Sequence, residues 1–362
     1  MNIGIDIKAL YAGQGGIAAY ISRVLNALQE IDRDNNYFLF EKNPSSYNIV
    51  NPRWKKVVVG SKLPGTVWLL LKLPFYFSKY SLDVFWGPEQ ICACVFNPAK
   101  VKMISTIHDV AVKVCPETMQ TSNYWINRLF LKASIRKSNK VLTVSQCIKK
   151  EICSYYPKEI SPADVVVTYL GKPDWVISDK DIIVRKDHLL FVGSFEPRKN
   201  LMALLCALLV CRKEMGKTIA LRVIGPSGWK NNLTHKFIVD NDLSTQVTFS
   251  GFLDETGLLN EYRTCKAFIY PSIYEGFGLP ILEAMAAGAP VLTSRGTSME
   301  EFAAEAVVLF DPLAPRDIAE KIALVYSADG GHRGKMEKYG ALLQRFAWKK
   351  TASEILRILT SE

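Results

Sequence analysis

Residues 267–293 read AFIYPSIYEGFGLPILEAMAAGAPVLT. Two short apolar runs, Ala267–Tyr270 and Pro290–Thr293, have the length and composition of buried strands. Between them lie a glycine-containing loop and then an apolar run that Pro280 opens, as proline does in a first helical turn. A strand, a helix and a second strand in this order predict one unit of a parallel α/β sheet.

The same alternation runs along the whole chain. Amphipathic stretches such as Ile17–Ile31 and Tyr124–Lys137 separate short apolar strands. Buried strands that alternate with helices predict parallel sheets covered on both faces. We therefore expect an α/β protein with two doubly wound, Rossmann-like domains that face each other across a cleft. The strands are predicted near Asn2–Ile7, Tyr37–Phe40, Lys56–Val59, Leu82–Trp86, Lys102–Ile107, Lys140–Val144, Asp164–Thr168, His188–Val192, Ala220–Ile224, Gln246–Phe249, Ala267–Tyr270, Pro290–Thr293 and Val307–Phe310.

A polar stretch, Gly171–Lys186, has no apolar period and marks the predicted domain boundary. We expect an N-terminal domain over residues 1–172 and a C-terminal domain over residues 187–345. Residues 346–362 are expected to form a helix that packs back on the first domain. Because open α/β sheets bind ligands beyond the carboxyl ends of their strands, the loops at those ends are the candidate functional segments.

Charge is unevenly distributed over the 362 residues, whose formal net charge is +10. Residues 1–180 hold 23 Lys and Arg against 14 Asp and Glu, a net of +9, whereas residues 181–362 hold 22 against 21. A basic half suits phosphate, nucleic acid or an anionic membrane, and it also suits a merely solvated surface. No recognisable nucleic-acid module accompanies the charge, so we expect no nucleic-acid partner.

The eight cysteines follow no metal-binding spacing, so no metal is expected. The N-terminal residues lack the pattern of a signal peptide, which together with the cysteines predicts a reducing cytoplasm. The most apolar stretch, Leu63–Phe77, is interrupted by Lys72 and Pro74 and is too short for a span of ~20 residues. Its lysines and aromatic residues suit a helix at a membrane interface, but a buried helix packed on a sheet is the favoured interpretation.

Three loops that follow predicted strands carry candidate chemistry. Gly15 and Gly16 precede a helix, where backbone N–H groups meet anions, although a tight turn explains them equally well. His108 suits hydrogen bonding, acid–base chemistry or a structural role. Arg198 and Lys199 stand at a helix start, where positive charge is unfavourable without an anion. They therefore favour a phosphate site over a solvated pair.

A fourth loop contains two carboxylates eight residues apart. Glu275 follows a strand, and Gly276 and Gly278 free backbone N–H groups to face a ligand. Glu283 is expected in the first turn of the next helix, where the helix dipole alone favours a carboxylate. Nothing comparable explains Glu275. The pair therefore indicates recognition of a hydroxyl-rich ligand.

This pattern resembles the E-x7-E motif of the retaining glycosyltransferases of family 4. The likeness extends over nearly the whole chain. It includes GG at 15–16, TIHD at 106–109, TVSQ at 143–146, EPRKN at 196–200, YEGFGLPILEAMA at 274–286 and FAWKKTA at 346–352. The resemblance implies the GT-B fold and transfer of a sugar from a nucleotide donor with retention. It also implies that no metal or other cofactor takes part, and that the leaving diphosphate accepts the acceptor's proton.

The resemblance also implies residue roles. His108, Arg198, Lys199 and Glu275 are expected to be catalytic. His108 would touch the donor sugar, the two cations would stabilise the diphosphate, and Glu275 would contact sugar hydroxyls. Glu283 would hold the ribose, and the base pocket would lie around Gly225–Pro226 and Phe249–Phe252. The expected donor-binding residues are Gly15, Gly16, Ser194, Arg198, Lys199, Phe252, Glu275, Gly276, Phe277, Gly278, Leu279 and Glu283.

Two positions depart from the family pattern. Many members carry arginine where Ser194 stands, and Arg198 is expected to take over that cation. Many also have Ser-Leu-Pro-Glu where residues 298–301 read SMEE, so that Glu301 is the matching residue. Glu275, Glu283 and Lys199 are intact, which implies an active enzyme.

The likeness is to mannosyl- and rhamnosyltransferases of bacterial polysaccharide assembly. It implies a hexose donor, with GDP-mannose as the expectation and UDP- or dTDP-sugars as alternatives. The expected acceptor is a lipid-diphosphate-linked oligosaccharide of O-antigen or capsule type, bound by the first domain at an anionic membrane surface. The expected location is the cytoplasm, peripheral at the inner face of the plasma membrane.

Three other functions compete with this one. A non-catalytic sugar-nucleotide-binding partner of another transferase is the alternative from another class, with Ser194 as its main support. A sugar-nucleotide 2-epimerase would not predict E-x7-E. An NAD oxidoreductase would need G-x-G-x-x-G, which the glycine loop lacks.

Overall fold

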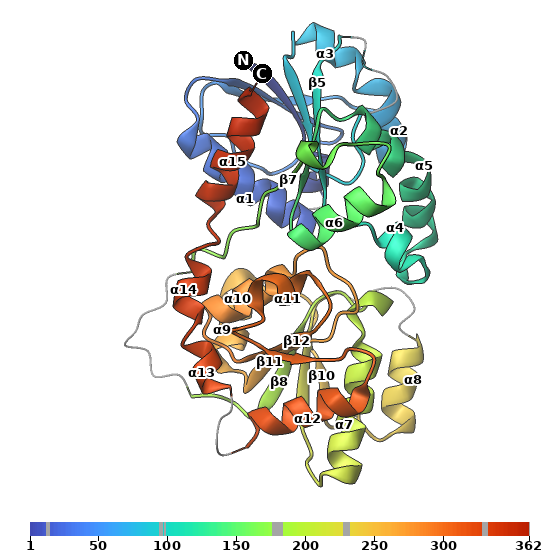
Figure 1. The fold of residues 1–362 in the computed structure, drawn as a ribbon, viewed down its shortest axis with the longest axis vertical. Coiled ribbons are helices and arrows are strands. Elements are labelled where there is room, and N and C mark those ends of the chain that lie inside the picture. Colours follow the sequence, from blue (N-terminus) through green and yellow to red (C-terminus); the bar gives the residue numbers. More distant parts are fainter. Residues whose placement is uncertain are drawn as a thin grey trace. The chain divides into compact units, whose positions relative to one another are not determined.

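The computed structural model describes residues 1–11, 15–93, 97, 99–175, 184–226, 232–327 and 332–361, so part of the predicted boundary stretch lies outside the described residues. The chain divides into two compact units (Figure 1). Unit 1 comprises Met1–Pro116, Thr121–Gly171 and Phe346–Glu362, and unit 2 comprises Glu117–Gln120 and Lys172–Arg345. Each unit contains one parallel sheet, so the predicted α/β class with two Rossmann-like sheets is confirmed.

Unit 1 is built on seven parallel strands in the order β3-β2-β1-β4-β5-β6-β7. The chain runs outward from β1 to β3 and then returns to place β4 on the other side of β1. Loops at such a reversal of strand order are where α/β sheets bind ligands. The strands are β1 Asn2–Asp6, β2 Asn36–Glu41, β3 Trp54–Val58, β4 Val84–Gly87, β5 Lys102–Ile107, β6 Lys140–Thr143 and β7 Val165–Val167.

The helices of unit 1 include one from the far end of the chain. α15 packs beside α1 (Figure 1). The ring of Trp348 lies 6.3 Å from that of Tyr20. A Cβ at Gly171 would lie 2.4 Å from the backbone nitrogen of Trp348, so only glycine allows the chain at residue 171 to pass this close to the start of α15. The helices are α1 Gly16–Ile31, α2 Gly65–Val67, α3 Phe75–Lys79, α4 Ala111–Val114, α5 Thr121–Lys137, α6 Gln146–Tyr155 and α15 Trp348–Thr360, with short turns over Lys8–Tyr11 and Pro162–Asp164. A further turn, Pro116–Thr118, begins in unit 1 and continues into the residues assigned to unit 2.

The apolar stretch Leu63–Phe77 is not one helix. It consists of α2, a π-helical turn over Trp68–Lys72, and α3 after Pro74. Five of its apolar side chains are buried: Trp68, Leu69, Leu70, Leu73 and Phe77. The favoured interpretation, packing in the protein core, therefore accounts for most of its hydrophobicity. In the part of the chain that the structure describes, no helix is long and apolar enough to cross a membrane.

Unit 2 is built on six parallel strands in the order β10-β9-β8-β11-β12-β13. Its strand order reverses between β8 and β11. The strands are β8 His188–Val192, β9 Ala220–Ile224, β10 Val247–Phe249, β11 Ala267–Tyr270, β12 Val291–Ser294 and β13 Val308–Phe310. The helices are α7 Leu201–Glu214, α8 Asn232–Asp240, α9 Glu255–Thr264, α10 Leu279–Ala286, α11 Ser298–Ala303, α12 Pro315–Val325, α13 Arg333–Met336 and α14 Tyr339–Leu343, with a short turn over Pro197–Lys199.

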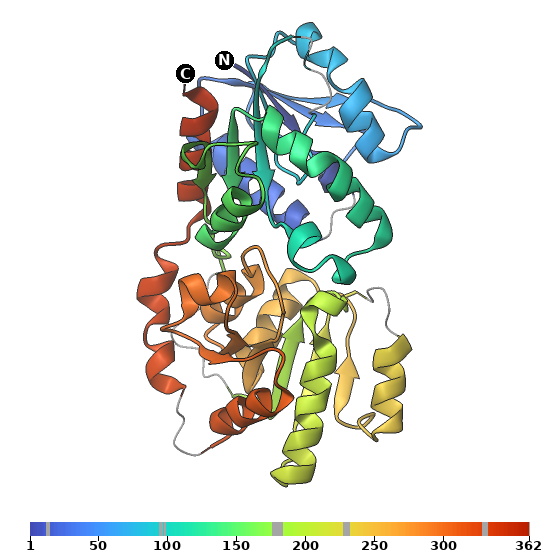
Figure 2. The same cartoon turned by 45° about the vertical axis from the view of Figure 1, so that its right-hand side comes forward.

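One face of this sheet is covered by α7 and α12, which lie side by side in both views (Figures 1 and 2). Leu204, Leu205 and Leu208 of α7 are fully buried against strand residues such as Phe191 and Leu221. Burying such side chains contributes about 1.5–3 kcal/mol each. This core fixes the sheet, and the loops after β8 and β11 emerge next to each other from its carboxyl edge.

Candidate active site

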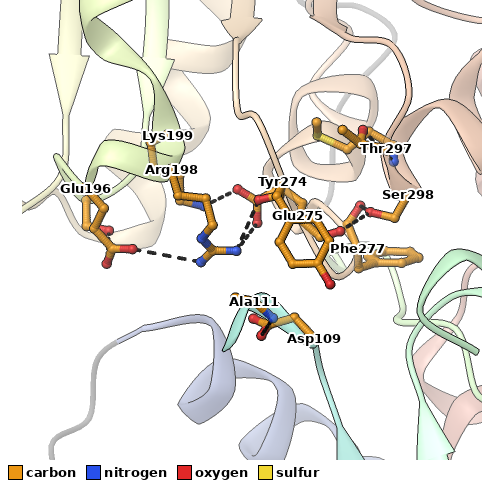
Figure 3. Close-up of polar contacts among 12 residues, drawn as sticks. Asp109, Ala111, Glu196, Arg198, Lys199, Tyr274, Glu275, Phe277, Thr297 and Ser298 are labelled. Atoms are coloured by element: carbon orange, nitrogen blue, oxygen red, sulfur yellow. Dashed lines mark hydrogen bonds and ion pairs between the residues drawn. The ribbon is translucent and has the colours of Figure 1, made fainter. Parts of the chain in front are cut away.

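The loops after β8 and β11 bring together three charged side chains that the sequence singled out (Figure 3). The Lys199 Nζ lies 2.6 Å from Glu275 Oε1, and the Arg198 Nη1 lies 3.4 Å from Glu275 Oε2. Lys199 also donates to the Tyr270 hydroxyl at 2.5 Å, and Tyr270 donates to Glu275 at 3.2 Å. All four side chains are largely shielded from solvent.

The backbone holds these side chains in place. Arg198 and Lys199 lie in the short turn before α7, and Asn200 ends that turn with a positive φ of 58°. The Asn200 amide donates to the carbonyls of Pro271 and Pro312, at 3.1 and 2.7 Å. The Ile273 N–H donates to the Arg198 carbonyl at 2.9 Å. The two loops are thus fixed to each other independently of the ion pairs.

Electrostatics keep this group ionised. Burial alone would raise the pKa of Glu275, but attraction to Lys199 and then Arg198 outweighs burial and lowers the pKa to about 2. Burial lowers the pKa of Lys199, and attraction to Glu275 outweighs it and raises the pKa. Burial, followed by repulsion from Glu275, raises the pKa of Tyr270 to about 12. At neutral pH the group therefore contains one carboxylate, two cations and a neutral phenol.

A second carboxylate, Glu196, also faces Arg198. Its Oε2 lies 3.8 Å from Arg198 Nη2 (Figure 3), and its Oε1 accepts a hydrogen bond from the Ser194 hydroxyl at 2.8 Å. Ser194 therefore lies at the edge of the charged group, joined to it through Glu196. The Arg198–Glu196 contact is long for an ion pair, so it holds the guanidinium only weakly.

The loop after Glu275 is held by Ser298, the residue that opens α11. Its hydroxyl donates to the carbonyls of Glu275 and Phe277, at 2.7 and 3.2 Å (Figure 3). Phe277 stacks on Phe302 with 4.7 Å between ring centroids. Gly278 has a φ of 102°, and a Cβ there would lie 2.8 Å from a Met299 side-chain carbon. Glycine is needed on both counts, and α10 begins at the next residue.

Glu283 does not lie in the first turn of α10, so that expectation is wrong. The helix begins at Leu279, which makes Glu283 its fifth residue, and the first turn contains no acidic side chain. The helix dipole acts within the first turn, so it does not account for Glu283. Glu283 Oε2 instead accepts a hydrogen bond from the buried Tyr262 hydroxyl at 3.1 Å. Tyr262 in turn packs against Trp175 and Phe268.

The segments expected to form the base pocket come close together in unit 2. Gly225 has a φ of 139°, and a Cβ there would lie 2.2 Å from the Gly193 carbonyl oxygen. The Gly225 N–H donates to the Gly251 carbonyl at 2.8 Å, so the loops after β8, β9 and β10 are in contact. Phe252 follows directly and is largely exposed. This places an accessible aromatic ring beside the glycine positions.

The remaining candidates, Gly15, Gly16 and His108, belong to unit 1. Gly15 has a φ of 100°, and Gly16 opens α1. The His108 Nε2 lies 2.8 Å from the Pro88 carbonyl oxygen, and because a carbonyl only accepts, this nitrogen carries a proton. Burial is the main cause that lowers the pKa of His108, so the ring is neutral at pH 7. Tyr20 packs edge-on against it at 4.9 Å.

The structure adds charged and polar residues that the sequence reasoning missed. Tyr270 was included only as the last residue of a predicted strand, and Tyr262 was not singled out, because an aromatic side chain in an apolar stretch gives no signal of its own. In unit 1, Lys8 bridges Asp6 at 2.7 Å and Glu89 at 2.8 Å. This ion triad joins the end of β1 to the loop after β4. Among the described residues, no group of three or more His, Cys, Asp or Glu side chains is arranged to hold a metal ion.

The sequence of this chain is similar to those of known glycosyltransferases. The family model for "glycosyl transferases group 1" matches residues 177–342. O-antigen chain mannosyltransferase B of Escherichia coli is 27% identical over 70% of this chain and 69% of its own length. O-antigen chain mannosyltransferase RfbU of Salmonella typhimurium is 26% identical over 80% of this chain and 81% of its own.

Solved structures of low sequence identity share the fold. WaaG, a glycosyltransferase involved in lipopolysaccharide biosynthesis, has a TM-score of 0.78 at 16% identity, covering 99% of this chain and all of WaaG. Anabaena HepE in complex with UDP and glucose has a TM-score of 0.77 at 17% identity over the whole of both chains. The fold is therefore that of GT-B glycosyltransferases, as predicted. This chain is a glycosyltransferase, and its residues 177–342 match the family model of glycosyl transferases group 1.

Proposed function

We propose that the enzyme transfers mannose from GDP-mannose, with retention of configuration, to a lipid-diphosphate-linked oligosaccharide in bacterial surface polysaccharide synthesis. The observation that carries the proposal is the group formed by Glu275, Lys199 and Arg198 at the strand reversal of unit 2. A carboxylate held ionised by two cations suits a donor that contains both hydroxyl groups and a diphosphate. The two relatives named as O-antigen mannosyltransferases support mannose as the sugar.

The proposed chemistry is a single transfer without a metal. The bond from the anomeric carbon to the diphosphate oxygen breaks, and the acceptor oxygen bonds to that carbon on the same face. The acceptor's proton passes to the leaving diphosphate. Negative charge grows on the diphosphate as the bond breaks, and Lys199 and Arg198 are placed to stabilise it. The N-terminus of α10 adds backbone N–H groups that favour an anion.

Other residues take supporting roles in this proposal. Glu275 accepts hydrogen bonds from donor-sugar hydroxyls, and Glu283 holds the ribose. Phe252 stacks beside the base. Gly15, Gly16 and His108 serve the transfer from unit 1, which also binds the acceptor. Its basic character suits an anionic acceptor and an anionic membrane surface, with the enzyme peripheral at the inner face of the plasma membrane.

Thermal unfolding with a panel of nucleotides tests the donor. We expect GDP and GDP-mannose to raise the melting temperature by several degrees more than the UDP, dTDP and ADP compounds. A ligand at about 100 times its Kd stabilises a protein by about 2.7 kcal/mol. Selective stabilisation by UDP or dTDP would replace the proposed donor. GDP-mannose that binds but is never transferred to any lipid-linked acceptor would instead favour a non-catalytic sugar-nucleotide-binding subunit.

Replacing Glu283 by alanine is expected to weaken GDP binding itself. Loss of a charged hydrogen bond to the ribose would raise Kd by about tenfold. Isothermal titration with GDP measures the effect, and Glu320→Ala, an exposed carboxylate on α12 of unit 2, is the control. An unchanged GDP affinity in Glu283→Ala, with the protein folded, would exclude the ribose role. Tyr262→Phe removes the phenol that bonds Glu283 and is expected to raise the Kd by a smaller factor.

Transfer is expected to continue in the presence of a chelator. The proposed leaving-group stabilisation comes from Lys199, Arg198 and a helix N-terminus, none of which requires a divalent ion. Initial rates with and without EDTA, and after addition of Mg²⁺ or Mn²⁺, measure the effect. Activity that EDTA abolishes and a divalent metal restores would overturn the metal-free mechanism.

A further inference from the structure

Helix α5, Thr121–Lys137, exposes large apolar side chains on the surface of unit 1. Trp125 is 52% exposed and Leu129 is 62% exposed. They are four residues apart, so they lie on the same face of the helix one turn from each other. The apolar residues that bind this helix to its unit, Leu131 and Ile135, are fully buried. Trp125 and Leu129 therefore form a second apolar stripe, which packing in unit 1 does not use.

A small basic pocket lies beside this stripe. It has a volume of about 70 Å³ and is lined by Val112, Lys113, Arg128, Lys132 and Tyr156, from α4, α5 and the end of α6. Because one water molecule needs about 10–15 Å³ of such a volume, the pocket has room for a phosphate-sized group. Lys113 approaches the Tyr156 ring at 5.8 Å, and Lys132 pairs with Glu159 at 2.8 Å. Three cations against one carboxylate leave the pocket positive.

The segment around the pocket, residues 101–160, is also strongly basic. Residues 101–160 hold ten Lys and Arg against four Asp and Glu, a net of +6. That is two thirds of the +9 carried by residues 1–180, in one third of their length. The basic character of the first half is thus concentrated around α4, α5 and α6 rather than spread over the unit.

We propose that this region docks on an anionic phospholipid bilayer. The α5 surface, defined as Lys113, Trp125, Arg128, Leu129 and Lys132, would hold a headgroup phosphate in the pocket while Trp125 and Leu129 enter the boundary between headgroups and acyl chains. Basic helices with exposed Trp and Leu bind membranes in this way, and tryptophan prefers that boundary. The proposal rests on the proposed function, because it names the surface by which the enzyme reaches a lipid-linked acceptor.

The apolar stretch Leu63–Phe77 is the competing membrane contact. Most of its apolar side chains are buried. The largest exposed aromatic surface in this stretch belongs to Phe75, whose side chain is 66% exposed. Its Lys72 donates to the Gly60 carbonyl at 2.5 Å, so that ammonium is already bonded within the protein. The α5 surface combines cations, a pocket and two exposed apolar side chains, and is therefore the better candidate.

Vesicle binding tests the proposal with two double variants. Arg128→Glu/Lys132→Glu reverses two charges, and Trp125→Ser/Leu129→Ser removes the apolar stripe. Lys and Arg side chains near an anionic membrane attract it, so the charge variant should bind phosphatidylglycerol-containing vesicles at least tenfold more weakly. Wild-type binding should weaken with added salt and be nearly absent on pure phosphatidylcholine. Thermal unfolding of each variant checks that it folds.

Matched controls come from α8 of unit 2, where Leu233 and Lys236 are exposed in the same way. Leu233→Ser and Lys236→Glu are expected to bind vesicles like the wild type, and Phe75→Ser should do so as well. Equal binding by the wild type and both α5 variants would overturn the proposal. A loss confined to Phe75→Ser would overturn it in favour of the stretch Leu63–Phe77.

Transfer to a water-soluble acceptor glycan separates this proposal from the proposed function. The α5 variants should transfer sugar to that acceptor at the wild-type rate and lose activity on acceptor embedded in vesicles. A wild-type enzyme that transfers sugar but does not bind anionic vesicles would contradict the docking proposal and leave the proposed function intact. An enzyme that binds vesicles through α5 but transfers no sugar would contradict the proposed function and leave the docking proposal intact.

Discussion

Replacing Glu275 by alanine is expected to lower turnover at least tenfold while GDP still binds. In the proposed donor complex this carboxylate accepts hydrogen bonds from the sugar, and charged hydrogen bonds contribute about 1.5–3 kcal/mol each. The nucleotide contacts come from other residues, so GDP affinity should change little. Steady-state kinetics with GDP-mannose, together with calorimetric titration of GDP, measure the two quantities separately.

The same substitution also tests the charged group in unit 2. Removing Glu275 leaves Lys199 and Arg198 largely buried without their carboxylate, and breaking such a buried pair costs about 3–5 kcal/mol. Glu275→Gln retains the shape and separates charge from packing. Glu320→Gln, which alters an exposed pair with Arg316 on α12, is the matched control. Equal losses of turnover and GDP affinity in a folded Glu275→Ala would refute the sugar-contact role.

Replacing Lys199 by methionine is expected to lower turnover about 10²- to 10³-fold, the usual effect of removing one donor that stabilises transition-state charge. Methionine retains most of the buried stem but not the ammonium that Glu275 and Tyr270 hold in position. Single-turnover rates at saturating GDP-mannose isolate the chemical step from donor binding.

Two further variants serve as controls for Lys199→Met. Lys199→Arg retains the charge and should recover part of the rate, although a planar guanidinium does not reproduce the contact to Tyr270. Lys213→Met, an exposed lysine at the end of α7, is expected to behave like the wild type. Turnover within a few-fold of wild type in Lys199→Met would mean that the diphosphate is stabilised elsewhere.

Much of the fold was predictable because its strands are short apolar runs between polar ends. The predicted bounds of β8, β9 and β11 are those of the structure. The prediction was less accurate where local sequence gives no signal. Helix α5 starts three residues before the predicted Tyr124, and Leu63–Phe77 breaks into short turns around a π-helical segment. Hydrophobic periodicity does not distinguish a π-helical turn from a regular one.

The site was predictable where a motif placed its residues on one loop. Arg198, Lys199 and Glu275 were selected from two motifs, and the structure brings them within hydrogen-bonding distance. Tyr270 was missed because its contact with Lys199 spans 71 residues of sequence and appears only when β8 and β11 pair. The contact of Ser194 with Glu196 was missed for a different reason. Both residues stand in the quoted motif, but the sequence does not determine the rotamers that bring their side chains together.

Unit 1 is completed by residues from the end of the described chain. Because α15 packs beside α1, this unit closes only after residues 346–361 have left the ribosome. The segment Lys172–Arg345 supplies every strand of unit 2, so its sheet can form during synthesis while the surface of unit 1 around Tyr20 still awaits Trp348. The sheet of unit 2, although encoded after that of unit 1, is thus able to form while unit 1 is still incomplete.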